Sequence, residues 1–367
     1  MKMMKSNIKV LFIHNAVPEY RIEFWKNLGE KVDLQLLITR RGLEDKIYGL
    51  DKNTNGLKIA YWNKGWIDKI IKYDVVIVPP IESVYEWKIA YKVVSLCKKR
   101  NIPCVYWNER WEWSEKKDLS AKRRLSYLAH RKLIKSVCKK TKRMIASGSK
   151  ARDYLKLLDL KNIDIAYDSS TSPVNSQLID FEKVYGIDRN DKVILFLGRI
   201  IKQKGLYHLL EAYKLQKEDY KLIVCGKGED KERCVQYAKE NHLDNVIFTG
   251  IVQPNLRGEY LKRATVFVLP SYLGEDCSVE AWGLTVNEAL EQGTPVIVSD
   301  VCGVAYDLAD GKQCIMVKNG DTMELARALK KMLENEKNEE ACKGLYRKYS
   351  VSGMVDSFAN TIESVIQ

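Results

Sequence analysis

Two glutamates, Glu280 and Glu288, are separated by seven residues and could act together on one ligand. Glu280 comes just before a stretch with helical character, residues 284–292, and Glu288 lies a little over one turn inside it. Because one carboxylate lies before the helix and the other inside it, they can reach different parts of one ligand.

The start of this predicted helix favours an anion. The backbone amides of Gly283, Leu284 and Thr285 lie where a helix has no intrahelical partners and carries the positive end of its dipole. A diphosphate is a suitable ligand for such a place. Gly283 also lets the backbone approach a ligand without a side chain between them.

Two cations form a second candidate group. Gly198 and Arg199 follow the apolar run 193–197, and Lys204 precedes Gly205 at the start of the next predicted helix. Arginine offers a planar fork and lysine a point charge, and both suit phosphate oxygens. The alternative interpretation is that both are solvated surface charges, in a chain with 61 Lys and Arg.

A strand–loop–helix–strand unit positions the glutamates. The apolar run 266–269 predicts a buried strand that stops at Pro270-Ser271, and residues 296–298 predict the next strand. The loop with Glu280 therefore lies at the carboxyl end of a strand, where open α/β sheets bind ligands.

Short apolar strands alternate with helices along the whole chain, which predicts doubly wound parallel sheets. A length of 367 residues favours two such α/β domains. We place the first domain at residues 1–170 and the second at 171–350, and we interpret the polar run 168–176 as the linker.

This pattern resembles the donor half of the retaining, GT-B-fold glycosyltransferases of family 4 (glycosyl transferases group 1). The matching residues are Pro270-Ser271, Glu280, Trp282, Gly283-Leu284, Glu288-Ala289 and Gly293-Thr294-Pro295-Val296-Ile297. Gly198-Arg199 and Lys204-Gly205 resemble the same family's donor-phosphate pair. The resemblance covers residues 190–320 well and the N-terminal half mainly by architecture.

The resemblance implies two Rossmann-like domains facing across a cleft, and sugar transfer from a nucleotide sugar to an acceptor hydroxyl with retention. Residues 171–350 would bind the nucleotide sugar, residues 1–170 would form the acceptor side, and a helix at 351–367 would pack back on the N-terminal domain. Arg199, Lys204 and Glu280 would be catalytic, and Glu288 would take the ribose hydroxyls. The other donor-binding candidates are Gly283, Leu284, Thr285, Gly198, Gly226, Gly250, Ile251, Val252 and Asn15. No cofactor and no metal are expected.

The N-terminal half departs from the family pattern. The loop after the first strand reads His14-Asn15-Ala16-Val17-Pro18 where many relatives have glycines, and Tyr20-Arg21 after it resembles a subgroup with a Pro-x-Tyr-Arg start. Many relatives carry a histidine where this chain has Asn108-Glu109. We therefore regard His14, Asn108 and Glu109 as acceptor-side candidates, although His14 could equally be structural.

Charge is concentrated in the first half of the chain. Residues 1–170 hold 36 Lys and Arg against 19 Asp and Glu, a net +17, and the remaining 25 against 29 give −4, which together make +13. Residues 116–143 contain 12 basic residues and one acid on a predicted amphipathic helix. This pattern suggests an anionic membrane surface and a lipid-linked saccharide acceptor in capsule, O-antigen or other lipopolysaccharide-like synthesis.

Other features limit the function classes. No apolar run approaches a membrane span and no signal-peptide pattern is present, so we expect a cytoplasmic protein that is peripheral on the membrane. Nine scattered cysteines without a CxxC pair predict reduced thiols. Aromatic-interleaved basic motifs are absent, so no nucleic acid is expected. Two alternatives stay open: another GT-B enzyme, such as a nucleotide-sugar epimerase, and a non-catalytic basic protein that binds membrane or nucleic acid.

Overall fold

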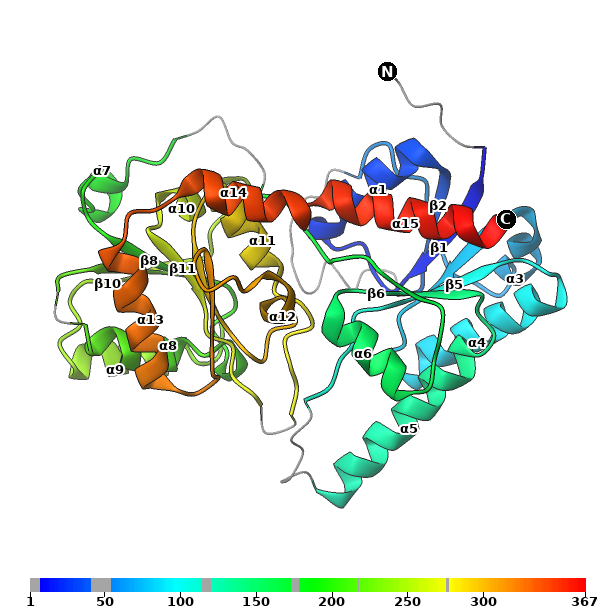
Figure 1. The fold of residues 1–367 in the computed structure, drawn as a ribbon, viewed down its shortest axis with the longest axis horizontal. Helices are drawn as coiled ribbons and strands as arrows, with labels where there is room; N and C mark the ends of the chain where they lie inside the picture. Colours follow the sequence, from blue (N-terminus) through cyan, green and yellow to red (C-terminus); the bar gives the residue numbers. More distant parts are fainter. Residues whose placement is uncertain (1–6, 41–53, 114–119, 173–177, 217, 275–276) are drawn as a thin grey trace. The chain divides into compact units, whose positions relative to one another are not determined.

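The computed structural model describes residues 7–40, 54–113, 120–172, 178–216, 218–274 and 277–367 (Figure 1). These residues form two compact units. The N-terminal unit holds the described residues up to 111, residues 120–170 and residues 350–367, and the C-terminal unit holds the rest.

The N-terminal unit is built on a seven-stranded parallel sheet with the order β3-β2-β1-β4-β5-β6-β7. Its strands are β1 (Lys9–His14), β2 (Asp33–Ile38), β3 (Ile59–Tyr61), β4 (Val75–Val78), β5 (Cys104–Asn108), β6 (Arg143–Ala146) and β7 (Ile163–Ile165). Its helices are α1 (Glu19–Lys31), α3 (Trp66–Lys69), η1 (Ile70–Lys72), α4 (Val84–Lys99), α5 (Ala121–Cys138), α6 (Ser149–Leu157) and α15 (Val351–Ile366).

Helices α1 and α15 cover one face of this sheet, although they lie more than 300 residues apart in sequence (Figure 1). Ser350 begins α15, because its hydroxyl accepts a hydrogen bond from the Gly353 amide at 3.3 Å. The fully buried Phe358 ring stacks on Phe12 of β1 with the centroids 6.0 Å apart. Burying one such aromatic side chain contributes about 2–3 kcal/mol, so α15 is part of the core of this unit.

The C-terminal unit holds a six-stranded parallel sheet with the order β10-β9-β8-β11-β12-β13. Its strands are β8 (Val193–Leu197), β9 (Lys221–Cys225), β10 (Val246–Gly250), β11 (Val266–Leu269), β12 (Val296–Ser299) and β13 (Cys314–Val317). Its helices are α7 (Phe181–Tyr185), η2 (Lys202–Lys204), α8 (Leu206–Lys214), α9 (Lys231–Glu240), η3 (Pro254–Leu256), α10 (Arg257–Arg263), α11 (Leu284–Glu291), α12 (Ala305–Leu308), α13 (Thr322–Glu334) and α14 (Glu339–Lys348).

The central strands β4, β8 and β11 are apolar along their whole length, because helices cover both faces of the sheets. All five side chains of β8 are buried, for example. Helices α8 and α13 pack together on one face of the second sheet, and α10, α11 and α14 pack on one another on the other. The prediction of doubly wound parallel sheets is confirmed.

The interpretation of residues 168–176 as a linker is partly wrong. Asp168, Ser169 and Ser170 are buried within the N-terminal unit, with exposed fractions of 3%, 0% and 0%. Their polarity serves hydrogen bonds inside the unit. Residues 173–176 of the predicted linker lie outside the described residues.

Candidate functional site

The C-terminal unit has a ligand-binding position between β8 and β11. These strands are neighbours, and the chain leaves them toward opposite edges of the sheet, β8 toward β9 and β11 toward β12. Open α/β sheets bind ligands outside the carboxyl ends of strands at such a switch point. The segments that follow these strands, residues 198–205 and the described parts of the loop after β11 (270–274 and 277–283), carry Gly198, Arg199, Lys204, Glu280 and Gly283.

Gly205 brings the two loops into backbone contact. It has a φ of +70°, and a Cβ atom there would lie 1.9 Å from the carbonyl oxygen of Pro270. The amide of Tyr272 also donates to the carbonyl of Gln203 at 2.7 Å. Only glycine fits both the conformation and the contact, which places the end of η2 directly against the loop after β11.

Lys204 and Glu280 meet at this junction. The Lys204 ammonium nitrogen lies 2.5 Å from a carboxylate oxygen of Glu280, and the side chains are 17% and 27% exposed. The Glu280 backbone is fixed as well, because its amide donates to Val301 at 2.9 Å and its carbonyl accepts from Gly303 at 3.1 Å. A partly exposed cation and carboxylate are thus held together where a ligand can reach both.

Helix α11 begins at Leu284, four residues after Glu280. Gly283 precedes it with a φ of +112°, and a Cβ atom there would lie 2.9 Å from Leu269. The buried Trp282 indole donates to Asn287 at 2.8 Å, and Asn287 donates to the Tyr349 carbonyl at 3.0 Å. These contacts fix the start of the helix, where Leu284 and Thr285 are partly exposed.

Glu288 lies deeper than Glu280 and has a cationic neighbour that the sequence analysis did not single out. Its side chain is 3% exposed, and one carboxylate oxygen lies 2.8 Å from Nη2 of Arg257 at the start of α10. Arg257 is 31 residues away in sequence, and no motif spacing connects it to Glu288.

The remaining donor-site candidates divide into two groups. Arg199 is exposed and Gly198 is half-buried at the end of β8. Gly250 has a φ of +79° with open space beside it, Ile251 is 61% exposed, and Val252 is half-buried, so the loop after β10 can meet a ligand.

Gly226 has a packing role in this structure. A Cβ atom there would lie 1.8 Å from the Gly198 carbonyl oxygen, and its amide donates to Gly250 at 2.7 Å. The glycine therefore lets the loops after β8, β9 and β10 lie side by side. That role explains its presence without a direct ligand contact.

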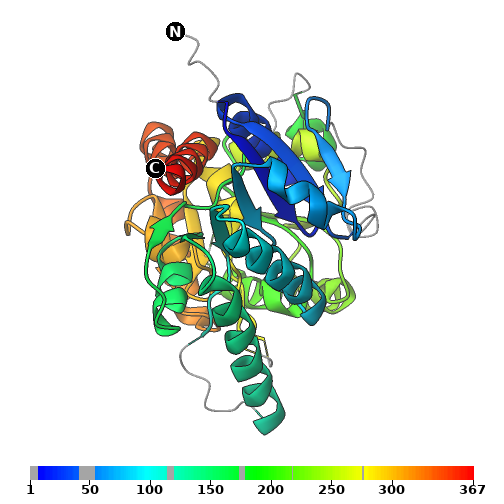
Figure 2. The same cartoon turned by 90° about the vertical axis from the view of Figure 1, so that its right-hand side faces the viewer.

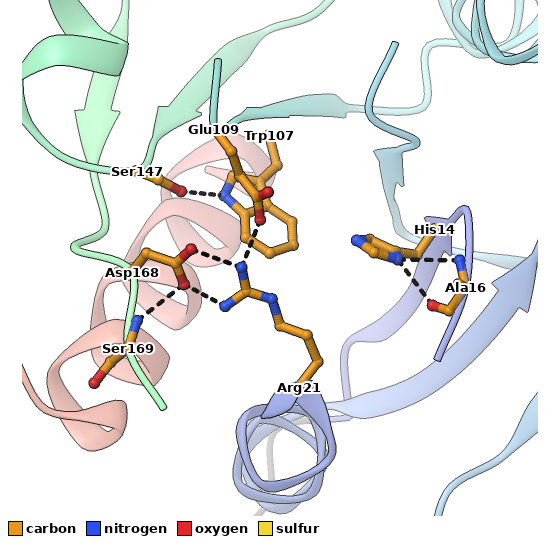
Figure 3. A network of polar contacts seen from close by, with 8 residues as sticks. All are labelled: His14, Ala16, Arg21, Trp107, Glu109, Ser147, Asp168 and Ser169. Carbon is orange, nitrogen blue, oxygen red and sulfur yellow. Dashed lines mark hydrogen bonds and ion pairs between the residues drawn. The ribbon is translucent and has the colours of Figure 1, made fainter. Parts of the chain in front are cut away.

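Two of the three acceptor-side candidates in the N-terminal unit are committed to packing. His14 is 6% exposed, and its Nδ1 lies 2.9 Å from the Ala16 carbonyl (Figure 3). Its ring packs on Trp25 and Trp107. Burial lowers the pKa of His14 to about 4. The buried Asn108 amide donates to the Arg110 carbonyl at 2.8 Å.

Asn15 and Glu82 lie at the switch point of the N-terminal sheet. They follow β1 and β4, neighbouring strands from which the chain leaves toward opposite edges. Asn15 is 9% exposed, and its side chain hydrogen-bonds to Glu82. Both residues are therefore placed at the ligand-binding edge of this sheet.

Glu109, the third acceptor-side candidate, is 33% exposed and belongs to a charged network around Arg21 (Figure 3). The guanidinium of Arg21 is 2% exposed and binds both carboxylate oxygens of Asp168, with Nη2 to Oδ2 at 2.6 Å. The same Nη2 lies 2.6 Å from a Glu109 oxygen, and the guanidinium lies over the Trp107 ring at 4.8 Å. Arg21 is thus held rigidly beneath the carboxylate of Glu109.

Opposing effects set the charge states in this network. Burial disfavours a charged guanidinium, but the carboxylates of Asp168 and Glu109 outweigh it and raise the pKa of Arg21. Burial raises the pKa of Glu109 to about 7, against the effect of Arg21, and the nearby charges of Asp168 and Glu82 raise it further. Glu109 is therefore a carboxylate that changes charge near neutral pH.

The predicted basic helix is α5, whose first half extends away from the sheet of its unit (Figure 2). Residues 121–138 contain six Lys and Arg and no acid. Leu125 and Leu128 are 68% and 53% exposed, whereas Ile134, Val137 and Cys138 are buried. The apolar side chains therefore serve two surfaces, one in the core and one open. Residues 116–119 lie outside the described part of the chain.

Among the described residues, none of the helices combines the length and apolar character needed to cross a bilayer. None of the described His, Cys, Asp and Glu side chains gather in threes that could hold a metal ion.

Comparison with known proteins finds a family match in the C-terminal half. Residues 179–348 match the model of the family described as "Glycosyl transferases group 1". The chain is 31% identical to the putative teichuronic acid biosynthesis glycosyltransferase TuaC of Bacillus subtilis, over 44% of this chain and 41% of TuaC. It is 31% identical to the phosphatidyl-myo-inositol mannosyltransferase of Mycobacterium leprae, over 41% of this chain and 40% of that enzyme. The alignments span about half the length, or less, of the curated relatives.

The fold is also found among solved structures. The crystal structure of Anabaena HepE in complex with UDP superposes with a TM-score of 0.76 at 13% identity, covering 97% of this chain and 100% of that chain. The likeness shows that both proteins have the GT-B fold.

Proposed function

Because residues 179–348 belong to the glycosyl transferases group 1 family, we propose that the protein is a retaining glycosyltransferase that uses a nucleotide sugar. The observation that carries this proposal is the Lys204–Glu280 pair at the start of α11. A cation, a carboxylate and a helix N-terminus in one place suit the diphosphate and the sugar of such a donor.

In the proposed reaction, the bond between the sugar's anomeric carbon and the diphosphate breaks, and the acceptor oxygen bonds to that carbon on the same face. Lys204, Arg199 and the amides at the start of α11 stabilise the negative charge that develops on the leaving diphosphate. The leaving diphosphate takes the acceptor's proton, so no side chain has to act as a base. Glu280 holds sugar hydroxyls and Glu288 holds the ribose. Because the cations neutralise the charge, we predict that no metal is required.

On the acceptor side, we propose Glu109 as the residue that binds a saccharide hydroxyl. His14 and Asn108 are buried, with exposed fractions of 6% and 1%, whereas Glu109 is partly exposed on a loop at the carboxyl end of β5. A carboxylate held by a rigid guanidinium is a pre-organised hydrogen-bond acceptor.

We propose a lipid-linked saccharide as the acceptor, reached by a cytoplasmic enzyme at the membrane surface in cell-surface polysaccharide synthesis. Exposed leucines among lysines and arginines on α5 suit the interface of an anionic bilayer. The names of two relatives refer to teichuronic acid and to a phosphoinositide, which is consistent with such acceptors.

The donor site is tested by thermal-shift binding of UDP, GDP, ADP and dTDP, each with and without EDTA. A ligand that binds the native state raises the melting temperature. We expect one nucleotide to stabilise the protein in EDTA, and Lys204→Ala to abolish most of that shift. If no nucleotide shifts the wild type, the donor site is wrong, and the basic binding-protein alternative is favoured.

The membrane surface is tested by flotation with vesicles of phosphatidylglycerol and with vesicles of phosphatidylcholine. We expect binding to the anionic vesicles, and its loss in the double variant Leu125→Ser, Leu128→Ser. Leu157→Ser is the matched control, because Leu157 is 61% exposed on α6 of the same unit. Equal flotation of all three proteins would contradict the proposal.

A further inference from the structure

Arg257 and Glu288 form an ion pair whose two members differ in exposure. The distance from Nη2 of Arg257 to a carboxylate oxygen of Glu288 is 2.8 Å, and the side chains are 28% and 3% exposed. Arg257 is the first residue of α10, which packs directly on α11. The pair therefore joins the start of one helix to the interior of the next.

A buried ion pair is a costly way to hold two helices together. Removing two charges from water offsets much of their attraction, and apolar residues of similar size are often at least as stabilising. Apolar and neutral groups also hold α10 in place: Leu261 on α10 is buried, and its carbonyl accepts a hydrogen bond from Thr294, which follows α11, at 2.6 Å. The charge on Glu288 therefore calls for a use other than packing.

The position of Arg257 indicates what that use is. The loop after β10, with Gly250, Ile251 and Val252, is followed by the short helix η3 (Pro254–Leu256), and Arg257 comes next. We place the base of the nucleotide against this loop, where Gly250 has open space beside it, because Glu288 meets the adjoining ribose in the proposed function. Arg257 thus links the backbone that faces the base to the carboxylate that faces the sugar of the nucleotide.

We propose that Arg257 is a positioning residue that orients the Glu288 carboxylate to accept hydrogen bonds from the ribose 2′- and 3′-hydroxyls. This inference rests on the proposed donor site and adds to it the residue that sets its preference for ribonucleotides. A carboxylate can accept from two hydroxyls of one diol. A guanidinium that already holds the carboxylate removes the conformational freedom that ligand binding would otherwise cost.

The test measures discrimination between nucleotides. Dissociation constants of UDP, GDP and ADP, each beside its 2′-deoxy counterpart, are determined by calorimetry for the wild type, Arg257→Ala, Arg257→Lys and Glu288→Gln. We expect the wild type to bind its preferred ribonucleotide about 10-fold or more tightly than the deoxy form, as for a hydrogen bond to a charged group. In Arg257→Ala the ratio should fall close to one, and Arg257→Lys should restore part of it.

The matched control is Arg263→Ala at the other end of α10. Arg263 donates to the backbone carbonyl of Asp188 at 2.6 Å, so its loss loosens the same helix without touching Glu288. We expect it to leave the ribose-to-deoxyribose ratio unchanged. If Arg257→Ala does not fold, Arg257→Gln, which keeps a hydrogen-bond donor beside the intact Glu288 without the positive charge, should still lower the ratio below the wild-type value.

The outcomes separate the two proposals. If the wild type binds a nucleotide and the variants at position 257 keep its discrimination, the role of Arg257 is wrong and the donor site stands. If the wild type binds none of the six nucleotides, the donor site itself is wrong and this inference falls with it.

Discussion

Replacing Glu109 with glutamine should make the protein more stable at pH 8 and less active. The physical reason is the raised pKa of Glu109, about 7 against an ordinary 4.5, which burial causes first and the charges of Asp168 and Glu82 increase. The folded chain therefore binds the proton of Glu109 more tightly than the unfolded chain does. The resulting stabilisation is complete below pH 4.5 and is lost as the pH rises through about 7.

The expected gain in the free energy of unfolding follows from the two pKa values of Glu109. The difference between about 7 and 4.5, at about 1.4 kcal/mol for each pH unit, sets an upper limit of about 3–4 kcal/mol. Because the side chain is 33% exposed, solvent screening reduces this to about 1–2 kcal/mol. For a unit of this size, that corresponds to a rise in melting temperature of about 2–8 °C.

The assay is thermal unfolding of the wild type and of Glu109→Gln at pH 5, 6, 7 and 8. We expect similar melting temperatures at pH 5 and a growing advantage of the variant toward pH 8. Glu23→Gln is the control, since Glu23 is exposed on α1, the helix of Arg21. Sugar transfer should fall in Glu109→Gln while nucleotide binding stays unchanged.

The opposite result would refute this reasoning. If Glu109 served only as a structural partner of Arg21, with its 2.6 Å contact as its contribution, its removal would lower the melting temperature at pH 8. A functional carboxylate is instead maintained at some expense to stability, as is common in active sites. A destabilised variant at pH 8 would thus remove Glu109 from the acceptor side.

Three further predictions concern the framework and the donor site. Asp168→Ala should lower the free energy of unfolding by about 3–5 kcal/mol in urea titrations, because it leaves the buried guanidinium of Arg21 with one carboxylate fewer; a loss below about 1 kcal/mol would contradict this. Gly205→Ala should destabilise the protein by more than the about 1–2 kcal/mol of a positive φ alone, since a Cβ atom would lie 1.9 Å from a backbone oxygen. Gly186→Ala is its control, with a φ of +64° and open space beside it, and equal losses would refute the contact argument. Arg199→Ala should change stability by less than about 0.5 kcal/mol, because the side chain is exposed, but should reduce turnover about 100-fold or more, and unchanged turnover would exclude it from the site.

The alternation of short apolar strands with helices along the sequence made the fold predictable. The apolar runs before Gly198 and before Pro270 are the central strands β8 and β11, whose carboxyl ends lie on the same side of the sheet. Parallel sheets bury such strands on both faces, so their sequences are short and continuously apolar. Because β8 and β11 are neighbours in the sheet, the loops after them lie side by side and bring Lys204 into contact with Glu280.

Contacts between distant residues were not predictable in the same way. Asp168 is 147 residues from Arg21 and lies in a polar run that reads as a linker. Arg257 carries no local signal that would distinguish it among 61 Lys and Arg. In both cases, the partner is chosen by tertiary packing, which local propensity and spacing do not encode. Only Arg21 had a local signal in the sequence, because the Tyr20-Arg21 pair at the start of the first helix resembles a subgroup of the family.

The path of the chain through the N-terminal unit affects how the protein is made. Helix α15 supplies Phe358, which stacks on Phe12 of β1, yet it is synthesised after the whole C-terminal unit. From residue 170 to residue 350 there are 350 − 170 = 180 residues, which a ribosome adds in roughly ten to forty seconds. During that interval the first sheet has no α15 over its aromatic face, and the second unit can fold independently. The N-terminal unit is therefore finished last, and the apolar face that α15 covers stays open until then.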